Sequence, residues 1–384
     1  MERSLESILQ RSRLSKDRVL LLQNLHLEEI PDLSGFGWVT ELNLGNNNIS
    51  DIVKCKLPPN LKELILYQNK LSVVDPYHLL DTIEILDISK NFLNFDGTHF
   101  YNIKKLTISH NSLTEFKYPP NIEQLDISHN SLTKIDEFPS SMIDIDCSNN
   151  ELDELPMMYE GLKRIDLSHN HLTVIEDFPN STIYIEAEGN SIADVKGLPS
   201  GLEELHLSDN RIQIFEAVLP PSLTALDLSD NMLTEMPDLP TNIETIDLSN
   251  NRLINIKYIP ESVKMLDISN NCLTELSDEL KKRDIRLSYG KNMIDDEESE
   301  YESFWMPGNK VTHNSTNHFD EYNINRWRNL GTSTAAGTGW KYDEFNIDNW
   351  RSANTTPAYS FSSSKTRASN PNYVSINNKK HVIV

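Results

Sequence analysis

An asparagine recurs at nearly constant spacing through most of this chain. The copies at Asn231 and Asn251 show the frame LxxLxLxxNxL, in which aliphatic residues stand eight, five and three positions before the asparagine and two after it, and this frame can be carried along the chain. The twelve asparagines are Asn47, Asn69, Asn91, Asn111, Asn130, Asn150, Asn170, Asn190, Asn210, Asn231, Asn251 and Asn271. Neighbouring copies are 19 to 22 residues apart. A period of this length is typical of a solenoid, in which similar units stack and share one core.

Each unit alternates apolar and polar residues just before its asparagine. In one unit Leu226 and Leu228 alternate with small or polar neighbours, which is the pattern of a short strand with one apolar face. We therefore expect every unit to contribute one strand to a parallel sheet. The asparagine amide carries both donors and an acceptor, and we expect it to satisfy buried backbone groups where the chain turns.

Proline precedes most of these strands, as in LPPNL at 57, LPPSL at 219 and IPESV at 259. Because proline lacks a donor and fixes its backbone angle, the segments between strands should be extended or form single 3-10 turns. One segment differs. In SVVDPYHLLD at 72–81, Asp75 and Pro76 predict a short helix with its cap.

The sequence divides into three parts. Residues 1–19 include Leu5, Ile8 and Leu9 at helical spacing and are predicted to form an N-terminal capping helix. Residues 20–294 are predicted to form the solenoid, with twelve full repeats and a variant repeat at each end. A short helix is expected in SDELKKR near its C-terminal end. Residues 295–384 start with the acidic run DDEESEYE and are low in apolar residues, so we expect an acidic linker and a largely disordered tail.

Short repeats of the form LPxxLxxLxLSxNxL resemble the leucine-rich repeats of bacterial effectors, which include the invasion-plasmid-antigen ubiquitin ligases. The resemblance covers roughly residues 20–294. It implies a strand-dominated leucine-rich repeat solenoid of the α/β class, with a curved parallel sheet on a concave face, extended or 3-10 convex segments, short capping helices and a mostly irregular C-terminal tail.

The same resemblance bears on activity. In those ligases, catalysis resides in a separate helical C-terminal domain with an essential cysteine, whereas no cysteine follows Cys272 in this chain. The resemblance therefore implies recognition without ligation. Repeats of this kind are also found in giant DNA viruses, and the abundant asparagine, isoleucine and lysine suit an AT-rich genome, so a viral leucine-rich repeat protein is a second interpretation of its origin.

The net charge of −23 lies almost wholly in the repeats. Residues from 293 onward carry 11 acidic and 9 basic side chains, or −2, which leaves 47 acidic and 26 basic side chains, or −21, for the remainder. Such a surface argues against nucleic acids and anionic membranes as partners, because both reward basic residues.

The cysteines and the hydropathy of the sequence indicate the cellular compartment in which the protein works. Cys55, Cys147 and Cys272 lie in distant repeats and form no disulfide framework or zinc motif. No apolar run approaches the roughly 18 residues that a membrane span needs. We therefore expect a cytoplasmic location, which would be the host cytosol for a viral or effector protein.

Acidic residues dominate the outward position four residues before the repeat asparagine. The column is Asp87, Asp126, Asp146, Asp166, Glu186, Asp227, Asp247 and Asp267. One interpretation is an acidic ridge that recognises a protein with a basic surface. The other is that LDLS is a common consensus in such repeats and the aspartate only keeps the surface soluble.

Two neighbouring columns vary from repeat to repeat and are better candidates for specificity. Tyr67, Ile85, Tyr184 and Met265 are predicted to be exposed apolar contacts for a partner, and Arg164 lies in the same set. Scattered apolar residues on an ordinary surface are the alternative for each of them.

Catalysis, cofactor binding and metal binding are not expected. His110, His129 and His169 share one column, but lone surface histidines explain them better than a metal site does. Cys272 has no evident base beside it and is a poor candidate for a nucleophile. No phosphate-binding glycine loop is present.

The tail contains a near duplication, HFDEYNINRWR at 318–328 and KYDEFNIDNWR at 341–351. Its aromatic positions are Phe319, Tyr322, Trp327, Tyr342, Phe345 and Trp350. Three interpretations remain open: a doubled docking motif that gains avidity, copies that pack on each other or on the solenoid, and a duplication without function.

Together these features predict a non-enzymatic protein-interaction module that binds a protein through the concave face of the repeats, with a second contact through the tail. The alternatives are a substrate-recognition subunit of a ubiquitin ligase and a structural component of a viral particle.

Overall fold

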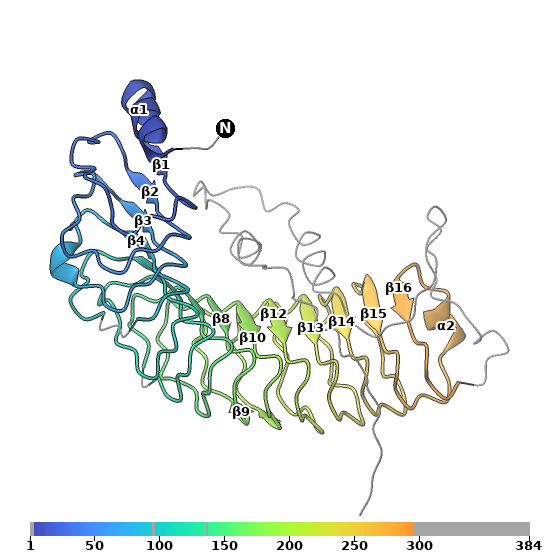
Figure 1. The fold of residues 1–384 in the computed structure, drawn as a ribbon. Coiled ribbons are helices and arrows are strands. Elements are labelled where there is room, and N and C mark those ends of the chain that lie inside the picture. Colours follow the sequence, from blue (N-terminus) through green and yellow to red (C-terminus); the bar gives the residue numbers. More distant parts are fainter. Residues whose placement is uncertain (1–3, 94–96, 136, 295–384) are drawn as a thin grey trace, which may run out of the picture. The chain divides into compact units, whose positions relative to one another are not determined.

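The computed structural model describes residues 4–93, 97–135 and 137–294. Predictions for the tail, including its duplicated aromatic motif, lie outside the described residues. The described chain is a solenoid whose turns follow one another in sequence order (Figure 1). This arrangement confirms the leucine-rich repeat fold class predicted from the sequence.

One parallel sheet of fourteen strands runs along the solenoid, and its strands pair in sequence order. The strands are β1 (Val19–Leu21), β2 (Glu41–Asn43), β3 (Glu63–Ile65), β4 (Ile85–Asp87), β5 (Lys105–Thr107), β6 (Gln124–Asp126), β7 (Asp144–Asp146), β8 (Arg164–Asp166), β10 (Tyr184–Glu186), β12 (Glu204–His206), β13 (Ala225–Asp227), β14 (Thr245–Asp247), β15 (Met265–Asp267) and β16 (Arg286–Ser288). A separate pair, β9 (Val174–Ile175) and β11 (Asp194–Val195), forms where two connecting segments run side by side.

The core is a stack of equivalent aliphatic side chains. In the repeat of Asn170, the frame residues Leu162, Ile165, Leu167 and Leu172 are all buried. The strands pair in the same register along the sheet, because the central residue of each strand pairs with the central residue of the next. A single repeat could not bury these side chains alone, so stability comes from the stack.

The repeat asparagines form a ladder along the interior, as predicted. The Asn170 amide donates to the carbonyl oxygens of Leu167 at 3.0 Å, Ser168 at 3.2 Å and Cys147, in the preceding repeat, at 3.1 Å. Its Oδ1 accepts from the backbone N–H of Leu152 at 3.0 Å. Each asparagine therefore closes its own turn and joins it to the turn before.

The residue before each ladder asparagine has a left-handed backbone. This conformation disfavours β-branched residues and admits asparagine, aspartate, histidine and glycine more readily. The thirteen residues are Asn46, Gln68, Lys90, His110, His129, Asn149, His169, Gly189, Asp209, Asp230, Asn250, Asn270 and Lys291. The composition of this column is thus a consequence of backbone geometry, and it includes the three histidines that share a column in the sequence.

One helix closes the N-terminal end of the array, and a 3-10 helix lies in the connecting segment between β3 and β4. Helix α1 (Leu5–Ser15) is capped by Ser4, and Leu5, Ile8 and Leu9 on one of its sides pack against the core. The 3-10 helix η1 (Pro76–His78) forms where Asp75 and Pro76 predicted it, and the Asp75 side chain accepts from the N–H of Tyr77.

The C-terminal end is closed by a helix and a final strand. Ser277 caps helix α2 (Asp278–Lys281), which lies within the segment predicted to be helical. The strand β16 then adds a last rung, in which Asn292 donates to the carbonyls of Ile268 and Tyr289. Asn292 is a thirteenth ladder asparagine. The sequence prediction missed it because tyrosine occupies the core position three residues earlier.

Candidate functional site

The outward residues of the fourteen strands, together with the residue two positions after each strand, form a surface that we call the sheet face. It has three columns, defined by their position before the ladder asparagine. The variable column lies six residues before it, the carboxylate column four, and the serine column two. The predicted contact residues are members of these columns, and the register places equivalent residues on adjacent strands.

The carboxylate column lines the sheet, but half of its members are not open to solvent. The exposed fractions of Asp126, Asp166, Glu186 and Asp247 are 3%, 8%, 5% and 4%. Asp87, Asp146, Asp227 and Asp267 are half-buried. The neighbouring columns therefore cover much of the predicted acidic ridge, and a partner could not contact these four carboxylates without displacing side chains.

Most of these aspartates have a structural role in the turn that follows the strand. In the unit of Asp227, Oδ1 accepts from the backbone N–H of Ser229 at 2.9 Å and from its hydroxyl at 2.7 Å. The same pair of bonds joins Asp87 to Ser89 and Asp126 to Ser128. An aspartate that binds its own backbone two residues later stabilises a turn. The sequence gives a signal for this contact, the recurring D-x-S, but not its role.

Burial changes the charge of the column. Desolvation, followed by the charge of Asp146, raises the pKa of Asp126 well above its usual value. Desolvation and the charges of Asp227 and Asp267 raise the pKa of Asp247 to about 8. In the variable column, desolvation raises the pKa of Asp144 to about 6. The sheet face is therefore less negative at neutral pH than a count of its carboxyl groups indicates.

His206 interrupts the carboxylate column and partly compensates its charge. Burial alone would lower the pKa of His206, but its contact with Glu204 and the charges of Glu186 and Asp227 outweigh burial, and the pKa is raised. The distance from Nε2 to Glu204 Oε2 is 3.5 Å. The histidine thus favours its charged form among carboxylates.

Tyr184 is buried, with an exposed fraction of 4%, so the prediction that it is exposed is wrong. Its hydroxyl donates to Glu186, and its ring centroid lies 5.5 Å from that of His206. The guanidinium carbon of Arg164 lies 4.0 Å from the ring centroid. A tyrosine packed under an arginine in this way positions the guanidinium, so Arg164 is the member of this cluster that a partner could meet.

The other predicted apolar contacts are half-buried. Tyr67, Ile85 and Met265 each keep part of their surface open. The Tyr67 ring lies close against Gly45 of the preceding repeat, so that a methyl group on Gly45 would stand only 2.1 Å from the ring atom Cε1. Glycine at that position allows the ring to lie there.

The three histidines of the asparagine turns do not form one site. His110 and His129 stack with ring centroids 4.1 Å apart and an interplanar angle of 8°. Desolvation, followed by the charges of His129 and Lys90, lowers the pKa of His110 to about 4. His169 instead lies 3.5 Å from Glu188. Within the described residues, no group of three or more metal-binding side chains occurs.

Two further properties concern the whole described chain. Cys55, Cys147 and Cys272 are free thiols, and Cys147 is buried in the core. Among the described residues, no helix has the length and hydropathy that a membrane crossing requires.

Known proteins share this architecture. The family described as Leucine Rich repeat matches residues 38–52. YopM from Yersinia enterocolitica is 27% identical over 71% of this chain, with a TM-score of 0.59. The match spans 64% of that YopM chain, less than two thirds of its length. YopM from Yersinia pestis, described as a leucine-rich effector protein, is 25% identical over 75% of this chain and 81% of its own, with a TM-score of 0.57.

A third structure shows the fold alone. The APL1 leucine-rich repeat domain is 24% identical over 67% of this chain and 75% of its own, with a TM-score of 0.56. No curated protein matches the sequence significantly. Proteins with this fold generally mediate protein–protein interactions and are typically not enzymes. With its asparagine ladder, its parallel sheet and these likenesses, the chain has the leucine-rich repeat fold, and its short repeats are similar to those of the YopM structures.

Proposed function

We propose that the sheet face binds a protein partner and that the chain is a non-enzymatic interaction module. The observation that carries this proposal is the contrast between the columns. Serine, aspartate and asparagine recur where they hold the turns together, whereas the variable column differs between adjacent strands almost throughout, with Glu41 and Glu63 as the exception. Its half-exposed members include Glu63, Lys105, Asp144, Arg164 and Glu204. Side chains without a common structural role are free to serve recognition.

The size of the sheet face supports this role. A standard protein interface uses about 20–30 residues on each side. Each of the fourteen strands has two outward residues, and the serine column adds a position just after the strands, so the sheet face provides enough surface for such a contact. The parallel register also presents equivalent side chains on adjacent strands, so a partner would meet a continuous row.

The charge of the chain favours a partner with a basic surface. Direct contacts would come from half-exposed carboxylates such as Glu63, Asp144 and Glu204, because the covered aspartates of the carboxylate column cannot be reached in the same way. The column would contribute a negative potential that steers a basic partner toward the sheet face. Nucleic acids and anionic membranes do not fit this charge.

The proposal includes a cellular location for the chain and a second contact with the partner. Three free thiols favour a reducing compartment such as the cytosol. The likeness to a Yersinia pestis protein described as an effector favours the host cytosol. A second contact would come from the duplicated tail motif, which lies outside the described residues.

Charge reversal on the sheet face should weaken binding strongly. In the variant with Glu63→Arg, Asp144→Arg and Glu204→Arg, the affinity for a partner captured from host-cell extract is expected to fall at least about a hundredfold, because three contacts of about 1 kcal/mol each are lost and repulsion is added. Isothermal titration calorimetry with the purified partner measures this change.

A matched variant separates this effect from net charge. Glu151→Arg, Glu216→Arg and Glu235→Arg make the same change in charge at exposed residues that lie outside the three columns of the sheet face. This control should retain affinity within about threefold at physiological salt, where distant charges are screened. Equal losses in the two variants would show that the sheet face is not the binding surface.

A further inference from the structure

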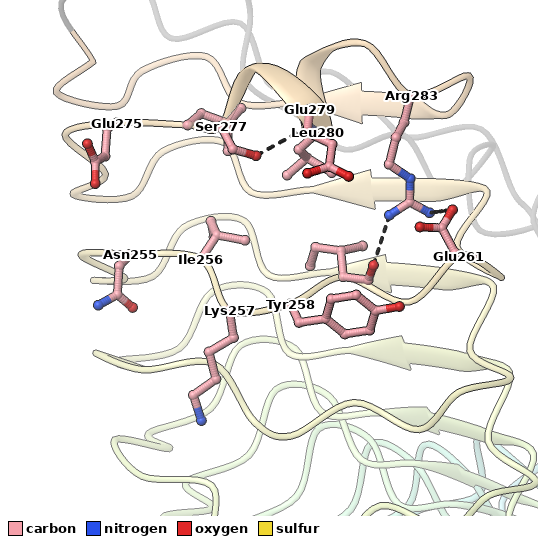
Figure 2. Close-up of a pocket in the computed structure, with 12 residues that line it drawn as sticks. Asn255, Ile256, Lys257, Tyr258, Glu261, Glu275, Ser277, Glu279, Leu280 and Arg283 are labelled. Atoms are coloured by element: carbon pink, nitrogen blue, oxygen red, sulfur yellow. Dashed lines mark hydrogen bonds and ion pairs between the residues drawn. The ribbon is translucent and has the colours of Figure 1, made fainter.

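A pocket opens near the C-terminal end of the solenoid, between α2 and the connecting segment of the preceding repeat (Figure 2). Its volume is about 530 Å³, which lies within the range of ligand-binding pockets. The strands of the sheet face contribute no side chain to it. The pocket is thus a second candidate binding site, separate from the sheet face to which the proposed function is assigned.

The change from an extended segment to a helix explains why the pocket lies here. In earlier repeats, adjacent connecting segments approach closely enough to pair, as β9 and β11 do and as Glu137 and Met157 do in an isolated bridge. In the last repeat, α2 replaces the extended segment. Figure 2 shows side chains of α2 and of residues 255–261 facing each other across the resulting gap.

The deep part of the pocket is lined by apolar side chains. Ile259, Leu276 and Leu280 are buried members of the core, and Ile256 is half-buried beside them. Tyr258 forms a wall and is 74% exposed. An exposed aromatic residue next to a preformed apolar pocket is the kind of anchor site that protein interfaces use.

The rim carries both signs of charge, but its cations are already engaged. Lys257 Nζ lies 3.0 Å from Asp238 Oδ1. Arg283 donates to the carbonyl oxygens of Ile259 at 2.9 Å and Pro260 at 2.7 Å. Lys257 extends away from α2 in Figure 2. The arginine holds the connecting segment in place. Because both cations already have partners, neither is well placed to bind the negative charge of an acidic ligand.

Three carboxylates remain on the rim. Glu261, Glu275 and Glu279 are exposed, and Glu261 forms an ion pair with Arg283 at 3.8 Å, so Glu275 and Glu279 are the two that the proposed site uses. An apolar depth bordered by open carboxylates is complementary to an apolar side chain flanked by lysine or arginine. Phosphorylated or acidic segments would be repelled by the same rim.

We propose that this pocket docks a cationic segment of a partner protein, with an apolar side chain inserted between α2 and Tyr258 and with lysine or arginine residues against Glu275 and Glu279. The site takes a short linear peptide. It provides a contact on the connecting-segment side of the repeats that does not depend on what the sheet face binds.

Binding of a defined peptide tests the proposal. The probe is a peptide of two leucines with two lysines on each side and blocked termini, titrated into the full-length chain by calorimetry. The affinity is expected to fall roughly tenfold in the E275K/E279K variant, because two favourable charge contacts become repulsive. Tyr258→Ser, which removes one apolar wall, should weaken binding roughly fivefold.

Controls decide between docking and simple charge attraction. The E151K/D153K variant has the same change in net charge at exposed residues of another repeat, and it should bind the lysine peptide within about twofold of the unchanged chain at physiological salt. The counterpart peptide with glutamate in place of lysine should bind at least about tenfold more weakly.

Several results would overturn the proposal. Equal weakening in E275K/E279K and E151K/D153K would show that attraction is nonspecific. No measurable binding of the lysine peptide would show that the pocket does not take such a segment. Self-association of the chain in sedimentation that E275K/E279K abolishes would assign the pocket to a second copy instead.

Discussion

Asn170→Asp is expected to lower the free energy of unfolding by about 4 kcal/mol, which is more than the roughly 3 kcal/mol expected for Asn170→Ala. The aspartate has the same shape and keeps the acceptor for the N–H of Leu152. It loses the amide that donates to the carbonyls of Cys147, Leu167 and Ser168, and it places a carboxylate against those three oxygens. Alanine removes the same donors and also the acceptor for the Leu152 N–H, but it adds no charge. Each of the three carbonyls keeps a second donor, which is the Asn150 amide, the Asn190 amide or the N–H of Asn149.

Urea unfolding followed by circular dichroism measures both variants. Asn255→Asp is a suitable control, because Asn255 is exposed and the change in charge is the same, and it should alter stability by less than about 0.5 kcal/mol. If the aspartate variant at position 170 were as stable as the unchanged chain, the ladder would not depend on its donors.

Asp247→Asn is expected to stabilise the chain at alkaline pH, by about 2–3 kcal/mol at pH 8.5. Burial and the charges of Asp227 and Asp267 raise the pKa of Asp247 to about 8 in the folded chain, from an ordinary value of 3.8. Between these two values, the folded state holds a proton that the unfolded state has lost. Stability therefore declines as pH rises, by about 1.4 kcal/mol per pH unit for this group, and the decline ends above pH 8.

The asparagine variant should have a flatter profile because it has no proton to lose. Its Oδ1 can still accept from the N–H of Ser249, which lies 2.9 Å from Asp247 Oδ1. Unfolding in urea at pH 6.5, 7.5 and 8.5 measures the difference, and titrating groups distant from Asp247 cancel in the comparison with the unchanged chain. Asp209→Asn, at an exposed residue, serves as the control. Parallel profiles for Asp247→Asn and the unchanged chain would show that Asp247 is already ionised at neutral pH.

These two variants separate what the repeats need for folding from what they offer to a partner. Asn170 and Asp247 occupy columns in which one residue type recurs, and each satisfies backbone groups of its own turn. Residues such as Lys105 and Arg164 occupy a column with no such bonds in common. A division between regular structural columns and an irregular recognition column explains why the chain can repeat so closely and still present a specific surface.

Much of the fold could be predicted from the sequence, because periodicity reports which face a side chain lies on. The burial of Leu167 and Leu228, the asparagine ladder and the short helix after Asp75 all follow from local patterns that the structure confirms. The column before the asparagines also held an unused signal: its asparagine, aspartate, histidine and glycine residues point to a left-handed backbone.

The candidate site was less predictable, because alternation does not tell how far neighbouring columns cover a side chain. Asp126 and Tyr184 face outward along their strands and are nevertheless buried. Arg164 lies over Tyr184 because the two meet on adjacent strands, 20 residues apart in sequence. The pocket beside α2 depends on a change from an extended segment to a helix, and its volume has no sequence signature.

The proposed role of the sheet face as the partner-binding surface can be tested by carboxyl labelling. Labelling with glycine ethyl ester is read by mass spectrometry on the free chain and on its complex. Binding is expected to protect Glu63, Asp144 and Glu204 and to leave the labelling of Glu151, Glu216 and Glu235 unchanged. Protection of Glu151, Glu216 and Glu235, with unchanged labelling of the three sheet-face residues, would contradict it.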